Sequence, residues 1–459
     1  MIKNIDVFMI EKIINEGVIR GAEFVELFIE EAKEISISIE EGVIQSPSIC
    51  RNIGIGLRIF YHGRMAYLFS EGLDFETIRN NIIVTSKIVQ RSEKSQILLP
   101  SPKTIYYPDH KDSHIPMDIE KTVSSLKNTY ESSKNLSDKI EKIRMNYTGK
   151  QQNFIIANSR GLYIRHQRNI LSFRASASAR KHNKMQNGNV EIRSCGGDDV
   201  FEEFNPKTIC IQACNKALVK EDTREIKSGI TTAVICHGLL LHETVGHALE
   251  SDFAYKGNSV FSDKIGNKVA SENVTIVDNP LFSLGGGSIM IDDEGTQCKE
   301  TVLIENGYLR SFLYDIQTAE RMNTVSTGNG RRESYKYPPI PRMTNTILKE
   351  GDYGTEEIIH SVKNGIYIQR MSGGEYNIST GDFSCFINEG HAIENGHVTY
   401  PISGVSISGN CIKFLCNIDM VGSEFKVSSG DCCKLMQQIN IGMIQPVFRV
   451  RGIGIGGKQ

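Results

Sequence analysis

The chain has 459 residues, with 52 lysines and arginines against 54 aspartates and glutamates, and a formal net charge of −2. This balance argues against a protein that binds nucleic acid or an anionic membrane through bulk charge. The length suggests two or three domains and is sufficient for buried cores, and the hydrophobic fraction of 39% together with the low net charge argues against intrinsic disorder.

Neither a membrane span nor a secretion signal is expected. The most apolar stretch, residues 229–241, is shorter than the roughly 20 residues that a bilayer requires. Acidic residues flank the short apolar run 7–10, so this run does not resemble a signal peptide, and the cytosol is the default compartment. The 11 cysteines are scattered and include no CxxC pair, which favours reduced thiols over a disulfide framework.

The first part of the chain mixes helices and strands. Apolar residues at helical spacing predict a helix over residues 5–19. Alternating apolar residues predict two strands, at 25–29 and at 35–39, and the runs 53–60 and 65–69 predict a hairpin.

The same mixture continues up to about residue 190. Asp74 and Asp118 are positioned to begin two more helices. The runs 154–157 and 162–164 predict a second hairpin. Residues 178–189 are basic and poor in apolar side chains, and we expect an exposed loop there.

A domain boundary is expected after a helix that begins at Pro206. The run 220–225 contains no apolar residue, which is typical of a linker between domains. The sequence therefore predicts an α+β fold with an N-terminal α+β domain over residues 1–222, built on an antiparallel sheet. Residues 223–459 are expected to form a mainly β domain.

Turns and strands dominate the second part. Asn306-Gly307 and Asn395-Gly396 each lie between apolar runs and predict two hairpins, because both turn residues can adopt positive φ. The segment 452–457 fits the dinucleotide pattern GxGxxG, but only two residues follow it, so no helix can hold a pyrophosphate. A glycine-rich final strand is the better interpretation.

The most informative motif is H-E-x-x-x-H at residues 242–247, one residue longer than the zincin motif. In a regular α-helix, residues five apart point about 140° away from each other, so His242 and His247 would not face one metal ion. A π-type turn would return both to the same side, and Gly246 would lower the cost of that distortion. The motif alone equally fits a buried helix with two hydrogen-bonded histidines.

Beyond this motif, the chain resembles the TldD/PmbA family of metalloproteases, in particular its TldD branch. The matching segments are His242–Phe253, Lys256–Phe261, Ile291–Thr296, Ile304–Gly307, Thr327–Tyr335, Pro341–Thr346 and Gln445–Pro446, followed by the glycine-rich terminus. They occur in order over nearly all of residues 230–457, and the N-terminal half resembles the family more loosely.

The resemblance implies a zinc-dependent peptidase with the metal-binding helix near the start of the C-terminal domain. His242 and His247 would bind the ion, and Glu243 would be the catalytic base. The third ligand would be Cys432, which matches a family Gly-x-Cys-Gly-Lys segment except that Cys433 replaces the second glycine. Two histidines and one thiolate form an accepted catalytic zinc set.

The resemblance also implies partners and substrates. It suggests a heterodimer with a PmbA/TldE-like subunit that lacks the zinc motif, although a homodimer is also possible. The substrates would be extended peptides, in peptide maturation, including antimicrobial peptides, or in antitoxin turnover. No contact with membranes or directly with nucleic acid is expected.

Two other functions remain open on the sequence. The chain could be a non-catalytic interaction protein, since the family was once described as a modulator of DNA gyrase, but such a protein would not need Glu243. It could also be a zinc amidohydrolase that acts on small amides.

Two further groups of residues could serve the site. Arg331, Arg332 and Tyr335 match the family in a glycine-flanked loop and could line a substrate channel, although loop arginines are more often solvated. The acidic run 292–294 could bind a cation, although such turns are also usually solvated.

Overall fold

The computed structural model describes residues 2, 5–61, 63–89, 103–104, 119–181, 184–195, 205–219, 223–282, 285–402 and 404–457. The predicted boundary run falls partly at 220–222, outside these residues. The elements before it are α1 Val7–Ile19, β1 Phe24–Glu40, β2 Val43–Tyr61, β3 Arg64–Glu71, α2 Phe75–Val89, β4 Lys103–Thr104, α3 Ile119–Lys134, β5 Ile140–Asn158, β6 Leu162–Lys181, β7 Lys184–Ser194 and α5 Pro206–Val219.

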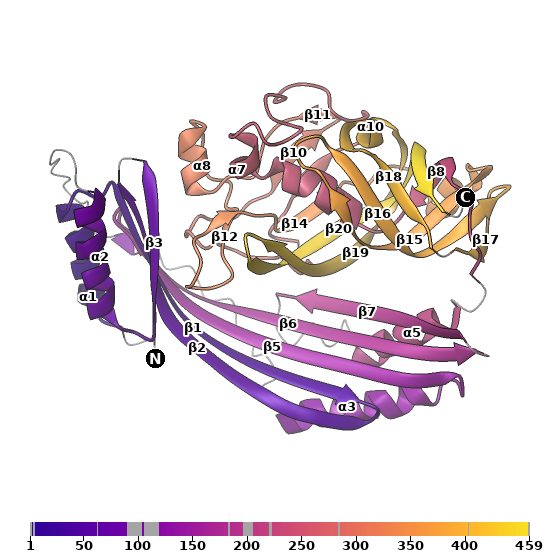
Figure 1. Cartoon of the computed structure of the whole chain (residues 1–459), viewed down its shortest axis with the longest axis horizontal. Coiled ribbons are helices and arrows are strands. Elements are labelled where there is room, and N and C mark those ends of the chain that lie inside the picture. The colour runs from indigo at the N-terminus through magenta and orange to yellow at the C-terminus, as the bar shows by residue number, and fades with distance from the viewer. Residues whose placement is uncertain are drawn as a thin grey trace.

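The N-terminal half is built on one long, curved sheet with strand order β3-β2-β1-β5-β6-β4, and β7 also pairs with β6. All of its pairings are antiparallel except the short one between β4 and β6. Figure 1 shows these strands curving beneath the C-terminal half of the chain. The predicted α+β fold with an N-terminal antiparallel sheet is confirmed.

The two faces of this sheet have different partners because side chains alternate along a strand. On β1, the odd-numbered apolar residues 25–29 pack with α1 and α2, and residues 35–39 pack with α3 and α5. The even-numbered side chain of Phe28 lies on the other face, in a cluster with Ile291 and Tyr335 of the C-terminal half. The helices therefore cover one face, and the C-terminal half covers part of the other.

Two local predictions are wrong. The expected strands at 25–29 and 35–39 are one strand, because the polar residues between them do not form a turn: Glu30 accepts a hydrogen bond from the Tyr335 backbone N–H at 2.7 Å. The expected loop at 178–189 is the end of β6 and the start of β7, with Ser178 paired to Asn187. Its polar side chains reflect an edge hairpin, whose residues 182–183 lie outside the described part.

The C-terminal half is mainly β. Its elements are β8 Gly229–Ile235, α6 Leu239–Leu241, η3 His242–Gly246, η4 His247–Leu249, α7 Ser251–Ala254, β9 Ile276–Asp278, β10 Thr301–Glu305, β11 Tyr308–Leu309, α8 Ile316–Arg321, β12 Gly330–Arg331, β13 Ile340–Pro341, β14 Asn345–Leu348, α9 Thr355–His360, β15 Asn364–Tyr376, β16 Asp382–Glu394, β17 His397–Pro401, β18 Ser406–Asn410, α10 Cys411–Cys416, β19 Ile418–Lys434 and β20 Gln437–Gly456.

The main sheet of this half closes on itself. Strands β20, β18, β16, β15 and β8 pair in that order, and β8 pairs back with β20, which makes a barrel. Both predicted Asn-Gly hairpins are present, as β10–β11 and β16–β17, and the glycine-rich end belongs to β20. A large apolar core fills this half and includes Leu240, Val245 and Leu249 from the motif segment.

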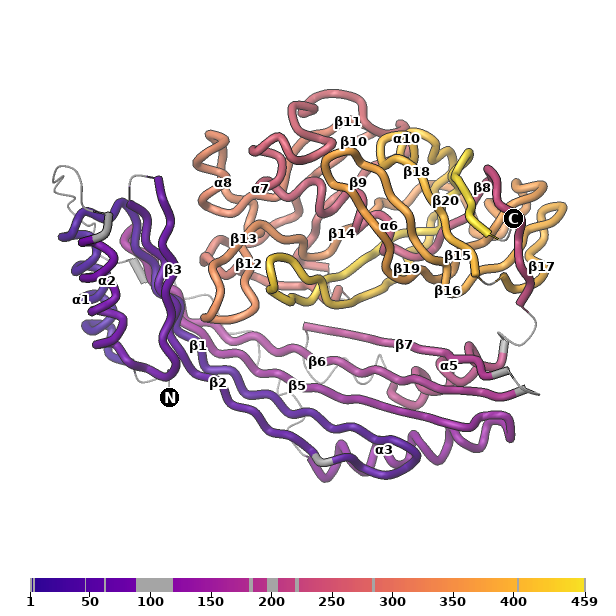
Figure 2. Tube along the Cα trace, viewed as in Figure 1, coloured from indigo at the N-terminus to yellow at the C-terminus, as the bar shows by residue number. Residues whose placement is uncertain are grey.

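The barrel extends into a long hairpin, β19–β20, that carries the candidate ligand Cys432. Figure 2 traces this hairpin to the side of the C-terminal half that faces β7. The Arg193 backbone N–H of the β7 edge donates to Ser429 Oγ on β19 at 3.0 Å. Within the described ranges, no helix has both the length and the apolar character needed to cross a membrane.

Candidate metal centre

The motif segment folds as a helical turn that is wider than an α-helix. Residues His242–Gly246 form a π-helical turn, in which the His247 backbone N–H donates to the carbonyl of His242, five residues earlier. The predicted wide turn between the two histidines is therefore present. It brings the imidazole rings together, with their centroids 4.9 Å apart and their planes at 70°.

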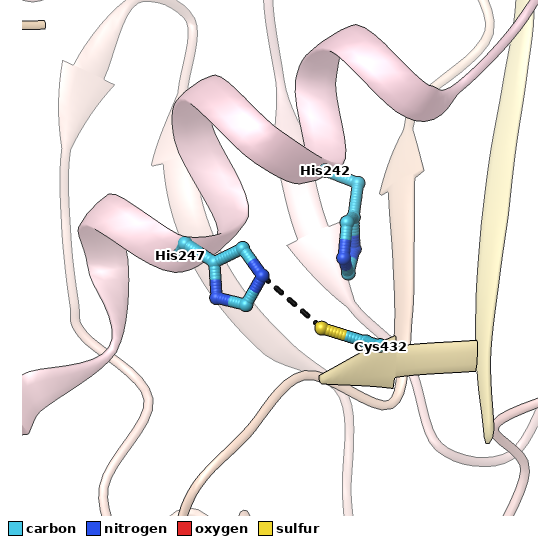
Figure 3. A group of neighbouring side chains, drawn as sticks. All are labelled: His242, His247 and Cys432. Carbon is cyan, nitrogen blue, oxygen red and sulfur yellow. Dashed lines mark hydrogen bonds between the residues drawn. The ribbon is translucent and has the colours of Figure 1, made fainter. Parts of the chain in front are cut away.

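The turn and the β19–β20 hairpin bring together three side chains that could hold a metal ion (Figure 3). Ligand atoms of His242, His247 and Cys432 all lie within 4.8 Å of one another. Cys432 Sγ is 3.1 Å from His247 Nε2. The three residues are only 2%, 9% and 5% exposed, so the centre is enclosed by protein.

The neighbouring thiol, Cys433, lies differently. Successive side chains of a strand point to opposite faces. Cys432 packs with Ile439, its partner across the hairpin, whereas Cys433 is exposed and pairs with Gln438. Cys432 is therefore the thiol that the strand directs toward the two histidines.

Glu250 holds the second histidine. His247 Nδ1 lies 2.9 Å from Glu250 Oε2, and this carboxylate is fully buried. A carboxylate at Nδ1 favours the tautomer that keeps a proton there and leaves Nε2 free as a ligand atom. Glu250 thus fixes the orientation of the imidazole toward Cys432.

Glu250 is in turn held by two cations. Lys434 Nζ donates to Glu250 Oε2 at 2.9 Å and to Asp252 Oδ1 at 2.7 Å. Arg342 Nε lies 3.7 Å from Glu250 Oε1, and Arg342 Nη2 donates to the carbonyl of Cys432 at 2.7 Å. This network ties the helical segment to the strand that carries the thiol.

The charges of the metal-free centre reinforce one another. Burial raises the pKa of the Cys432 thiol, but His242 and His247 outweigh it and lower this pKa to about 5. Burial lowers the pKa of His247, but Glu250 and Cys432 raise it to about 10. Burial raises the pKa of Glu250, but Lys434 and His247 lower it to about 2. The thiol is therefore a thiolate at neutral pH, which is the form that binds metals.

The donor set fits a transition metal ion. Zinc binds imidazole nitrogen at about 2.0–2.1 Å and thiolate at about 2.3 Å, so the three groups are gathered on the scale of one coordination sphere. His242 Nδ1 is buried and has no hydrogen-bond partner among the described residues, so the protein does not satisfy this ring fully by itself. Three protein ligands leave a fourth position open.

Glu243 lies at the edge of this centre rather than inside it. Its Oε2 atom is 3.9 Å from His247 Nε2, and its side chain is 27% exposed. The residue belongs to the same π-helical turn as His242. The carboxylate is thus close to the ligands and still reachable by water.

The other candidate residues are buried between the two halves of the chain rather than solvated. Arg332 Nη2 donates to Glu26 of β1 at 2.6 Å, and Arg58 of β2 lies between Glu26 and Glu294, at 2.6 and 2.5 Å. Tyr335 packs against Phe28. The acidic run 292–294 is buried in this ionic interface, so a solvated turn is the wrong interpretation of it.

Comparison with known proteins identifies the family. Three models described as the PmbA/TldA metallopeptidase C-terminal domain, central domain and domain 1 match residues 233–457, 112–221 and 25–93. A metalloprotease TldD homolog from Buchnera aphidicola is 31% identical over 458 residues, which cover 95% of this chain and 93% of the relative. The chain belongs to the PmbA/TldD metallopeptidase family.

Other proteins are similar to this PmbA/TldD chain in sequence or in fold. A metalloprotease from Methanocaldococcus jannaschii is 30% identical over 443 residues, which cover 94% of this chain and 96% of the relative. The solved structure of TldE from Thermococcus kodakarensis is similar in fold, with a TM-score of 0.79 at 20% identity, covering 98% of this chain and all of that one. A proposed modulator of a DNA gyrase from Thermotoga maritima has a TM-score of 0.81 at 22% identity, with the same coverage.

Sequence reasoning missed the residues that hold the candidate ligands of this PmbA/TldD chain in place. Glu250 lies three residues after His247, and Lys434 lies two residues after Cys432. The spacing partly indicated that both lie near the candidate ligands. Residues three apart on a helix are neighbours, as Glu250 is to His247, and residues two apart on a strand share a face, as Lys434 does with Cys432. Arg342 had no such signal, since nothing in its surroundings indicates that it reaches the Cys432 carbonyl.

Proposed function

We propose that this chain is a zinc-dependent peptidase of the TldD type, which hydrolyses peptides and unfolded polypeptide segments. The observation that carries the proposal is the convergence of His242, His247 and Cys432 within 4.8 Å, with Glu243 at the edge of the same centre. Two histidines and one thiolate with an open fourth position are a known set for catalytic zinc. The metallopeptidase family of the chain supports the same reaction class.

Each residue has a separate task in this proposal. His242, His247 and Cys432 would hold the ion, and Glu250 would orient His247 through Nδ1. Zinc bound there would supply a Lewis acid for the scissile carbonyl and for the attacking water. The carboxylate of Glu243 would take the proton from that water and deliver it to the leaving amine.

The enclosure of the centre supports extended substrates. The three ligands are nearly inaccessible, so a folded domain could not bring an internal peptide bond to them. An extended chain could dock through main-chain hydrogen bonds with little sequence preference. We therefore propose peptide maturation or degradation as the role, with loose specificity.

The proposal includes a partner and a place in the cell. The family contains subunits such as TldE, whose solved structure resembles this chain along its whole length. We propose that the chain works in the cytosol with a TldE-like subunit that lacks the zinc motif. If so, co-purification with such a subunit raises peptidase activity well above that of the chain alone.

The decisive experiment replaces Glu243 by Gln and measures zinc content and peptide hydrolysis on the same preparation. We expect Glu243→Gln to keep its zinc and its folded spectrum but to lose hydrolysis. Glu272→Gln, at an exposed position, is the matched control and should behave like the parent. Near-normal cleavage by the zinc-loaded Glu243→Gln chain would reject the proposal, and cleavage of small amides alone would indicate an amidohydrolase.

A further inference from the structure

A cavity of about 320 Å³ lies between the long N-terminal sheet and the β19–β20 hairpin. Its charged lining is predominantly basic. The cations are Lys150, Arg168, Arg193, Arg331 and Arg332, and the carboxylates are Glu34, Glu333 and Asp431. Two of these cations, Arg168 and Arg332, pair with carboxylates that lie outside the lining, so the attraction for an anion depends on the remaining cations.

Three of the arginines already have carboxylate partners. Arg168 pairs with Asp293 at 3.0 Å, and Arg193 pairs with Asp431 at 2.5 Å. Arg332 pairs with Glu26 at 2.6 Å. These side chains hold the two halves of the chain together and have little capacity left for a ligand.

Arg331 is different. Its side chain is buried, at 4% exposure, and Nη1 donates to the carbonyl of Met343 at 2.5 Å. Nε is buried without a hydrogen-bond partner, as it is in Arg168 and Arg332, but unlike in those two arginines no carboxylate of the described residues lies within ion-pair distance of the Arg331 guanidinium. A buried charge that has no carboxylate within ion-pair distance is costly, and a bound anion would offset that cost.

The charge environment of Arg331 agrees with this geometry. Burial lowers the pKa of Arg331, and the guanidiniums of Arg168 and Arg342 lower it further against the opposing effect of Asp293. A guanidinium nevertheless stays protonated at any physiological pH. The attraction of an added anion would therefore offset both the cost of burying this charge and the repulsion from Arg168 and Arg342.

The cavity borders the candidate metal centre. Met343, whose carbonyl receives the Arg331 hydrogen bond, also packs its sulfur against Gly246, between the two histidines of the motif. On the hairpin, Asp431 precedes Cys432, and Ile439 is the pairing partner of Cys432. Both line the cavity. A group bound at Arg331 would thus lie beside the strand that carries the thiol ligand.

We propose that Arg331 binds a carboxylate of the peptide substrate and thereby selects substrates that carry a negative charge near the cleaved bond. This inference rests on the proposed peptidase function. The planar guanidinium fork can hold a carboxylate through two parallel hydrogen bonds. The carboxylate could be an acidic side chain or the C-terminus of the peptide, and the experiment distinguishes these two sources.

The test compares three peptides of one sequence on the zinc-loaded chain. The first has a free C-terminus and an internal Glu, the second has an amidated C-terminus, and the third has Gln in place of Glu. We expect kcat/KM to fall about tenfold for whichever change removes the bound carboxylate, as is typical for the loss of a charge-assisted hydrogen bond. Equal rates for all three peptides would overturn the inference while leaving the peptidase proposal intact.

Variants connect the effect to Arg331. In Arg331→Gln, the preference for the charged peptide should disappear, whereas Arg331→Lys should retain part of it. Arg144→Gln, at an exposed arginine, should keep the full preference. Binding of the labelled peptides to the inactive Glu243→Gln chain provides a readout that is independent of turnover, and unchanged discrimination in Arg331→Gln would contradict the inference. If the parent chain cleaves none of the peptides, the result contradicts the proposed peptidase function rather than the role of Arg331.

Discussion

Gly246 and Met343 are in such close contact that a side chain at position 246 has no room. A Cβ atom built on Gly246 would lie 2.0 Å from Met343 Sδ, and Met343 is fully buried. Gly246 is the last residue of the π-helical turn that brings His242 and His247 together. The position of the Met343 side chain therefore requires a glycine at this point of the turn, and Met343 packs directly against the turn.

We expect Gly246→Ala to reduce both stability and metal binding. The added methyl group must displace the Met343 sulfur in a packed core, and overpacking of this kind costs about 1–3 kcal/mol. The displacement acts on the turn between the two histidines, so zinc content should fall as well. Denaturant unfolding and metal analysis of the same samples measure the two effects.

A second substitution checks the cause. Met343→Ala removes the sulfur that the new methyl group meets, so Gly246→Ala combined with Met343→Ala should recover part of the zinc content. Zinc content as low in the double variant as in Gly246→Ala would show that glycine is needed for the turn itself, not for the contact.

The two adjacent cysteines are expected to differ sharply. Cys432 is buried beside His247, whereas Cys433 is exposed. Cys432→Ser should lose most of the bound zinc, because a serine hydroxyl does not replace a thiolate ligand. Cys433→Ser should retain it. Metal analysis after dialysis measures both, and the opposite pattern would transfer the ligand role to Cys433.

Among the cations of β19, Lys434 is predicted to be the one whose substitution lowers the free energy of unfolding most. It donates to Glu250 Oε2, Asp252 Oδ1 and the carbonyl of Pro341. Lys434→Met would remove the cation of Asp252 and one of the two cations that hold the buried Glu250, which costs about 3–5 kcal/mol of unfolding free energy.

The same strand offers a control for this prediction. Lys426 is half exposed and reaches Glu424 only at 3.9 Å, so Lys426→Met should change stability little. A similar loss of unfolding free energy in Lys434→Met and Lys426→Met would mean that any loss of charge destabilises this strand. The hydrogen bonds of Lys434 would then have no special role.

The sequence allowed the centre to be predicted more fully than its surroundings. The five-residue spacing of His242 and His247 excludes a regular α-helix for a shared ion, and this geometry predicted the wide turn that the structure shows on the condition that both histidines face one metal ion. The third candidate ligand, Cys432, lies on a distant hairpin, and only the resemblance to a family indicated it. Spacing says nothing about which strands a closed barrel brings beside a helix.

The errors in the fold have a related cause. Residues 30–34 of β1 are polar except for Ala32 and were expected to separate two strands. Two of them, Glu30 and Glu34, are polar because they lie on the face that meets the C-terminal half and the cavity. A strand that is buried by two different partners loses the simple alternation of apolar and polar residues. The pattern becomes clear only once the second partner is known.

Metal binding should release protons, and the direction follows from the two ligand pKa values. In the metal-free chain the pKa of Cys432 is about 5 and that of His247 is about 10, so at pH 7 the thiol is already ionised and the imidazole carries a proton. Zinc requires the neutral imidazole, so binding at pH 7 should release about one proton, which comes from His247. The apparent affinity for zinc should therefore fall as the pH is lowered from 9 to 6, and more steeply below pH 5, where the thiolate is also protonated.

Titration calorimetry in two buffers of different ionisation enthalpy counts the protons that zinc binding releases. Glu250→Gln removes the carboxylate that raises the pKa of His247, and should release fewer protons at pH 7. Zinc binding to the parent chain with no proton release at pH 7 would contradict the thiolate–imidazolium pair on which this prediction depends.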